Sequence, residues 1–241
     1  MNIWQYAILS TVLLLIGAGV AAYLVKNPNR NVLQNMLSFS GAFLFGVLIL
    51  ELMPEVFSVH NSLPGLFFIL GFFLQTGMDY WTSGIEHGHM HVPKVPGRGF
   101  VVSLFIGLGI HAIMDGLPFA GVDVHGHRHE SVFMAILLHK LVEGFTIFIV
   151  LGMMNFSMKK SWWYIGFFSL ITPLGMLVFD SIESLHEHFQ YVLAFAGGSL
   201  LHVSVTILFE AENVHHHGMP LRKLISILMG LALAILITLN F

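Results

Sequence analysis

The chain has 241 residues, of which 56% are hydrophobic and only 10% are charged. This composition excludes an ordinary soluble domain and is typical of a polytopic membrane protein, because each helix that crosses the roughly 30 Å core of a bilayer needs about 20 mostly apolar residues. The net charge of −3 argues against a nucleic-acid partner, and the absence of cysteine excludes disulfides and thiolate metal sites.

Hydropathy along the chain predicts eight membrane spans joined by short loops. In chain order the predicted spans cover residues 3–25, 36–57, 64–85, 99–120, 130–153, 161–181, 189–209 and 220–239. No basic residue precedes Lys26, so we expect the first span to be a retained helix and not a signal peptide. The predicted fold class is therefore all-α, with residues 1–241 forming a single transmembrane domain.

Lysine and arginine are unevenly distributed among the predicted loops. Eight of them fall in the first, third, fifth and seventh loops, namely Lys26, Arg30, Lys94, Arg98, Lys159, Lys160, Arg222 and Lys223. With eight spans these four loops share one side of the bilayer, and the positive-inside rule makes that side cytoplasmic. Both termini are then expected to be extracytoplasmic, in a protein of the cell (inner) membrane.

Histidine and acidic residues gather near both ends of the predicted spans. At the outer end they include Glu51, Glu55, His60, Asp180 and Glu183, and at the inner end Asp79, His87, His89, His91, Glu210 and Glu212. Neutral imidazole and carboxylate together suit borderline divalent metals such as zinc. We expect the outer set to collect a cation and the inner set to release it. The alternative, that these are ordinary polar loop residues, stays open for each cluster.

Titratable residues also occur inside the spans, in two matched pairs. His111 and Asp115 in "HAIMDG", and His139 and Glu143 in "HKLVEGF", are each four residues apart, which places both members of a pair on one helix face. Two neighbouring antiparallel spans would then present two imidazoles and two carboxylates at similar depth. Such a set can bind a divalent cation, whose charge offsets the cost of burying the carboxylates. A structural hydrogen-bonding role is the alternative for either pair taken alone.

Two neighbours of these pairs have predicted roles. Pro118 follows Asp115 by three residues, so it should remove a hydrogen bond to the carbonyl of Met114 and kink the fourth span beside the site. Gly144 directly follows Glu143 and would allow a neighbouring backbone to approach closely.

These motifs resemble those of the ZIP family of divalent metal transporters. "HAIMDG" and "HKLVEGF" resemble the paired signatures of its fourth and fifth helices, and "ITPLG" (171–175) is similar to its sixth-helix motif. "LELMPE" (50–55) resembles the end of its second helix, with Glu51 where a histidine is usual. Carried over residue by residue, the family's transport site corresponds to His111, Asp115, His139 and Glu143.

The resemblance implies a fold and a function. Spans 1–3 and 6–8 would be inverted repeats around spans 4 and 5, in a 3+2+3 arrangement, and a homodimer is expected. The chain would be a secondary-type transporter that moves zinc, and other first-row divalent ions, toward the cytoplasm without a catalytic cofactor. Lys140 stands where some members carry a ligand for a second metal, so its ammonium is expected to replace that cation and leave a single site. The alternative function is an intramembrane zinc-dependent hydrolase that uses the same ligands.

Overall fold

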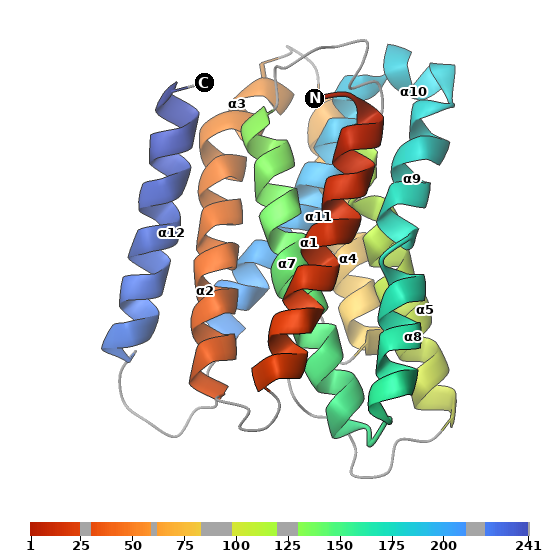
Figure 1. Cartoon of the computed structure of the whole chain (residues 1–241). Helices are drawn as coiled ribbons and strands as arrows, with labels where there is room; N and C mark the ends of the chain where they lie inside the picture. The colour runs from red at the N-terminus through yellow and green to blue at the C-terminus, as the bar shows by residue number, and fades with distance from the viewer. Residues whose placement is uncertain (25–29, 59–61, 83–97, 120–129, 211–219, 241) are drawn as a thin grey trace.

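The structure is a computed structural model that describes residues 1–24, 30–58, 62–82, 98–119, 130–210 and 220–240. All of its regular elements in these ranges are helices, and the long ones run roughly parallel or antiparallel to one another (Figure 1). They are α1 (Ile3–Leu24), α2 (Arg30–Val47), the π-helix η1 (Leu48–Leu52), α3 (Met53–Val56), α4 (Leu63–Thr82), α5 (Arg98–Met114), the 3₁₀-helix η3 (Leu117–Phe119), α7 (Glu130–Met153), α8 (Met158–Phe168), α9 (Ile171–Asp180), α10 (Glu183–Glu187), α11 (Phe189–Glu210) and α12 (Leu221–Asn240).

Within the described ranges, seven helical segments are long and apolar enough to cross a membrane. They are Ile3–Leu24, Gln34–Val56, Gly99–Phe119, Glu130–Met153, Met158–Asp180, Phe189–Phe209 and Leu221–Leu239. Each matches one of the eight predicted spans to within a few residues, which confirms an all-helical membrane protein. The remaining predicted span corresponds to α4, whose second half carries the polar residues Gln75, Thr76 and Asp79. A total of eight spans therefore stays a prediction.

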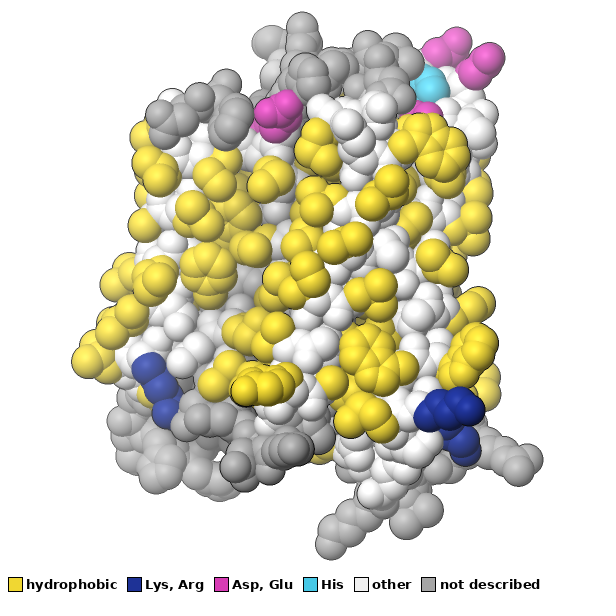
Figure 2. All heavy atoms as spheres, viewed as in Figure 1, with side chains coloured by type: hydrophobic (Ala, Val, Ile, Leu, Met, Phe, Trp, Pro, Cys, Tyr) yellow, Lys and Arg dark blue, Asp and Glu magenta, His cyan; other side chains and the backbone are white. Residues whose placement is uncertain are grey.

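The helices differ in how deeply they lie in the bundle. In α7, 83% of the most apolar stretch is buried, whereas the value for α12 is 17%. An apolar helix surrounded by protein on nearly all sides is a core element, while one with an exposed apolar face suits contact with lipid. The space-filling view shows exposed apolar side chains in a broad band around the middle of the visible face (Figure 2). The motif "HKLVEGF" thus lies on the most enclosed of these seven segments.

Charge separates along the bundle axis. The end of α9 and the short helix α10, which carry Asp180, Glu183 and Glu187, lie at one end, which we call the acidic end (Figure 1). The first turns of α8 and α12, which carry Lys159, Lys160, Arg222 and Lys223, lie at the opposite end, which we call the basic end (Figure 1). The first turn of α1 and the last turn of α12 are both at the acidic end (Figure 1). Lys26 and Lys94 fall outside the described residues.

Pro118 interrupts the fourth predicted span, as expected. The α-helix α5 ends at Met114, and a separate turn of 3₁₀-helix, η3, contains the proline. Asp115 lies in the break, where its backbone N–H still donates to the His111 carbonyl at 3.0 Å. The break rests on α9, since a Cβ atom on Gly175 would lie 2.7 Å from the Ile113 carbonyl oxygen. The glycine of the "ITPLG" motif therefore allows α9 to support the turn that carries Asp115.

Glycine also brings α1 against α7 beside Glu143. A Cβ atom on Gly144 would lie 2.1 Å from the carbonyl oxygen of Leu14, and one on Gly17 would lie 1.8 Å from that of Leu141. No side chain fits at such distances from a backbone atom, so this pair of glycines fixes the separation of the two helices. The expected close backbone approach at Gly144 is confirmed.

We expect Gly144→Ala to lower the free energy of unfolding by about 1–3 kcal/mol, the usual cost of overpacking a close contact. Gly152→Ala is the matched control on the same helix, because nothing lies within 4 Å of a Cβ atom at that position. Thermal unfolding of both variants in detergent measures the difference. Equal unfolding midpoints for the two variants would show that the α1–α7 crossing can relax.

Candidate metal centre

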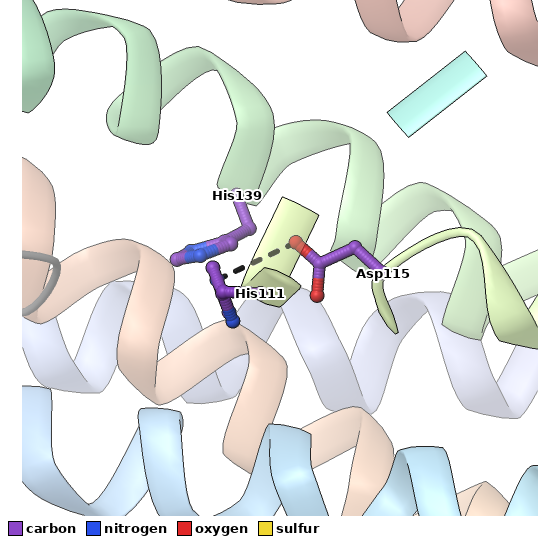
Figure 3. A group of neighbouring side chains, drawn as sticks. All are labelled: His111, Asp115 and His139. Atoms are coloured by element: carbon purple, nitrogen blue, oxygen red, sulfur yellow. Dashed lines mark ion pairs between the residues drawn. The ribbon is translucent and has the colours of Figure 1, made fainter. Parts of the chain in front are cut away.

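Three buried side chains from two spans converge near the middle of the bundle. His111 lies in the last turn of α5, Asp115 follows in the helix break, and His139 lies on α7. One potential ligand atom from each lies within 4.8 Å of those of the other two. Figure 3 shows both imidazole rings and the carboxylate turned toward a common region. Each of the three residues is at most 2% exposed.

The geometry within this group is defined by two contacts. His111 Nε2 lies 3.5 Å from Asp115 Oδ2. The rings of His111 and His139 are 5.9 Å apart between centroids and nearly perpendicular, at 87°. Two imidazoles and one carboxylate form an N₂O donor set of the kind that zinc accepts. The arrangement can therefore hold a divalent metal.

Lys140 lies beside the same group and contacts both buried carboxylates. Its Nζ atom is 2.6 Å from Asp115 Oδ2 and 2.6 Å from Glu143 Oε2. The ammonium is fully buried, and both carboxylates are at most 3% exposed. Removing ions from water costs several kcal/mol each, and only close pairing offsets that cost. One ammonium thus stabilises two carboxylates, one on its own helix and one in the break after α5.

Glu143 is not one of the three residues whose ligand atoms converge. The four-residue spacing does place it on the same side of α7 as His139, but its Oε2 atom is engaged by Lys140. The structure therefore brings together three of the four predicted transport-site residues. The fourth ligand stays a prediction.

Four of the residues predicted for the outer side are described, and their helices reach the acidic end. Glu51 lies within the π-helix η1, where its carboxylate accepts a hydrogen bond from Ser131 at the start of α7. Glu55 follows on α3, one turn later. Asp180 ends α9, where His186 lies 3.7 Å from its Oδ1 atom, and Glu183 begins α10. Insertions of this π-helical kind are frequent at functional sites.

The residues predicted for the inner side are described only in part. Asp79 lies near the end of α4, where its Oδ2 atom contacts His202 Nε2 of α11. Glu210 ends α11. His87, His89, His91 and Glu212 lie outside the described residues, as does His60 of the outer set.

Sequence reasoning missed His202. The available signal was a lone histidine in the apolar run "SLLHVSVT" of the seventh predicted span. An ionisable residue inside a span indicates a functional site whose partner should be sought. Its partner, Asp79, lies on a different helix, so no local spacing pattern joins the two.

A helical membrane bundle with a buried, metal-compatible donor group defines an integral membrane protein suited to handling divalent cations. The chain belongs to the ZIP zinc transporter family, because the model of that family, described as "ZIP Zinc transporter", matches residues 82–238. The family consists of transporters and not of enzymes, so the hydrolase alternative loses its support.

Named relatives agree with this family. Zinc transporter ZIP1 of Takifugu rubripes is 26% identical over 155 residues, covering 60% of this chain and 49% of the relative. Zinc transporter ZIP1 of Danio rerio is 24% identical over 171 residues, covering 63% and 55%. Protein zntC of Dictyostelium discoideum is 26% identical over 132 residues, covering 52% and 32%. The chain thus spans about half or less of the length of these relatives.

Proposed function

We propose that the chain is a secondary-type transporter that carries zinc, and other first-row divalent ions, across the membrane through a single site between α5 and α7. The observation that carries this proposal is the convergence of His111, Asp115 and His139, three buried potential ligands supplied by two membrane spans. Two relatives are named zinc transporters, which favours zinc as the principal substrate.

Glu143 completes the ligand set in this proposal. Its Oε1 atom is buried and has no hydrogen-bond partner in the described part of the chain. An acceptor in that state carries a desolvation cost that a bound cation would relieve. Lys140, held by Asp115 and Glu143, supplies the positive charge that a second metal would otherwise provide. The site therefore takes one metal ion.

The proposed path runs from the acidic end to the basic end. Glu51 and Glu55, with Asp180 and Glu183, gather the cation on the outer side. Release passes Asp79 and the carboxylates and histidines further along, namely His87, His89, His91, Glu210 and Glu212. The excess of basic side chains at one end supports a cytoplasmic assignment for that end.

The proposed architecture has eight spans, with α4 as the third, and both termini outside. Spans 1–3 and 6–8 form inverted repeats, and the protein alternates between outward-open and inward-open states as a homodimer. Tight glycine crossings support the repeat, because α4 (span 3) meets α11 (span 7) at Gly71 and Gly198, and α12 (span 8) meets α2 (span 2) at Gly230 and Gly46.

Uptake of radioactive zinc into proteoliposomes that contain the purified chain tests the proposal. We expect accumulation well above that of protein-free liposomes. Zinc binding to the purified chain without any accumulation would contradict transport while preserving the metal site.

We expect mild acid on the donor side to slow this uptake. Imidazole and carboxylate ligands must lose their protons before they bind a metal, so protons compete with zinc. The test is to measure the initial uptake rate at several zinc concentrations, once at neutral pH and once at mildly acidic pH. Competition predicts a higher apparent KM in acid with a nearly unchanged maximal rate, and a rate that rises with acidity would contradict it.

A further inference from the structure

A hollow lies on the exposed face of α8, near the basic end of the bundle. It has a volume of about 700 Å³, and the residues that line it are Lys159, Trp162, Trp163, Gly166, Phe167 and Leu170. α8 is on the outside of the bundle and begins at the basic end (Figure 1). Its opposite face, with Ser161, Ile165 and Phe168, is buried. The hollow therefore faces the bilayer and not the protein interior.

A glycine in the middle of a stripe of large residues leaves this hollow open. Lys159, Trp163, Gly166 and Leu170 follow one another at intervals of three or four residues, so they lie along one face of the helix. A Cβ atom on Gly166 would have no neighbour within 4 Å. Helix packing therefore does not require glycine at this position, in contrast to Gly144. The missing side chain leaves open space between large apolar walls.

The length of the stripe matches the depth of one leaflet. Lys159 and Leu170 are 11 positions apart, which corresponds to about 16 Å at a rise of 1.5 Å per residue. One leaflet provides about half of the roughly 30 Å hydrocarbon core of a bilayer. The acyl chain of a phospholipid with its headgroup at the basic end can therefore lie along the whole stripe.

The charge of the hollow is at the end where that headgroup would be. Lys159 lies in the first turn of α8, which contains no acidic residue, and Lys160 follows it. No acidic residue in the described part of the chain forms an ion pair with Lys159. Basic side chains at this depth attract anionic headgroups, and tryptophan is favoured at the same depth. A zwitterionic headgroup would bring its own ammonium close to two lysines, so the charge favours an anionic lipid.

We propose that this hollow binds an anionic phospholipid of the leaflet at the basic end. The lipid phosphate lies at the ammonium of Lys159, and one acyl chain extends past Trp163 and over Gly166 to Leu170. The inference goes beyond the proposed function, because the lipid is neither a metal ligand nor part of the metal path. It therefore stands or fails independently of zinc transport.

The bound lipid would contact a side chain that joins three helices. Trp162, in the wall of the hollow, packs against Phe148 of α7 with 5.3 Å between ring centroids. Its ring also lies 3.9 Å from the position that a Cβ atom on Gly19 of α1 would take. A ligand that binds only the folded chain raises its unfolding temperature. We therefore expect the anionic lipid to stabilise the packing of α8 against α1 and α7.

Quenching of tryptophan fluorescence by brominated lipids tests the proposal, because two of the four tryptophans line the hollow. Trp4→Phe and Trp81→Phe leave Trp162 and Trp163 as the emitting residues. This full-length chain is reconstituted into phosphatidylcholine bilayers that contain phosphatidylglycerol or phosphatidylcholine brominated in the acyl chains. We expect phosphatidylglycerol to bind about fivefold more tightly, the increment for one lysine at a membrane surface. Equal quenching by the two brominated lipids would overturn the proposal.

Two neighbouring lysines distinguish a lipid site from general attraction to a basic surface. Lys159→Gln is expected to abolish the preference for phosphatidylglycerol. Lys160→Gln is the matched control, because Lys160 points about 100° away around the helix and does not line the hollow. This control should keep the preference. An equal loss in both variants would show surface attraction alone and would contradict a site.

Filling the hollow provides a second, independent variant. Gly166→Leu introduces a side chain where a Cβ atom meets nothing, so the variant should fold and should lose the preference for phosphatidylglycerol. Gly152→Leu is its control, at a similarly open position near the end of α7. An unchanged preference in Gly166→Leu would overturn the proposal. So would a lack of quenching by either brominated lipid in the chain with an unfilled hollow, because another protein surface, such as a second copy, would then cover it.

Discussion

His139→Ala is expected to reduce zinc uptake into proteoliposomes to the level of protein-free vesicles. His139 provides the only potential ligand from α7 among the three convergent residues, so its loss leaves His111 and Asp115 on one side of the site. Two ligands from one segment would not be enough to replace the water molecules that coordinate the cation in solution. Glu143→Ala is expected to have the same effect on uptake if Glu143 is the fourth ligand.

The control for this experiment is a histidine outside the centre. His188→Ala alters an exposed histidine at the acidic end, whose imidazole contacts only the Ser184 carbonyl and Tyr191 among the described contacts. We expect it to retain most of the uptake. Both central variants should insert into the membrane and elute as the unaltered chain does. Normal transport by His139→Ala and Glu143→Ala would remove this site from the mechanism.

Lys140→Met is expected to destabilise the metal-free protein by about 3–5 kcal/mol, the usual cost of breaking a buried ion pair from one side. The substitution leaves the carboxylates of Asp115 and Glu143 buried without their shared cation. Zinc should then raise the unfolding temperature more in this variant than in the unaltered chain, because a metal ion can supply the missing charge.

A double variant separates the effect of the unpaired carboxylates from the effect of lost side-chain packing. Adding Glu143→Gln to Lys140→Met removes one of the two uncompensated charges and should recover part of the lost stability. Lys160→Met is the surface control, since Lys160 is exposed at the basic end. If Lys140→Met unfolds at the same temperature as the unaltered chain, with or without zinc, the ammonium does not perform the proposed role.

Much of the membrane architecture follows directly from the sequence. Runs of about 20 apolar residues must satisfy their backbone hydrogen bonds internally within lipid, which leaves the helix as the available structure for each run. The interruption of the fourth span near Pro118 has a similar local reason, because proline lacks an N–H and cannot continue the hydrogen-bonding pattern. The close approach at Gly144 is likewise a consequence of a missing side chain.

Other features depend on which helices meet, and no local pattern contains that information. The contact of Lys140 with Asp115 joins α7 to the break after α5, and it leaves Glu143 outside the convergent group. Asp79 and His202 are 123 positions apart, and their pairing depends on the packing of α4 against α11. α4 itself carries enough polar residues that its length and composition alone do not identify it as a span.

The sequence by itself therefore determined that the chain forms apolar helices, and it predicted two pairs of potential metal ligands, His111 with Asp115 and His139 with Glu143, because hydropathy and residue spacing are local properties. Only the tertiary structure decided where the buried charges are balanced. Coulomb energy depends on distances between residues on different helices, and helix packing sets those distances. Lys140 between two carboxylates, and His202 against Asp79, are both products of that packing.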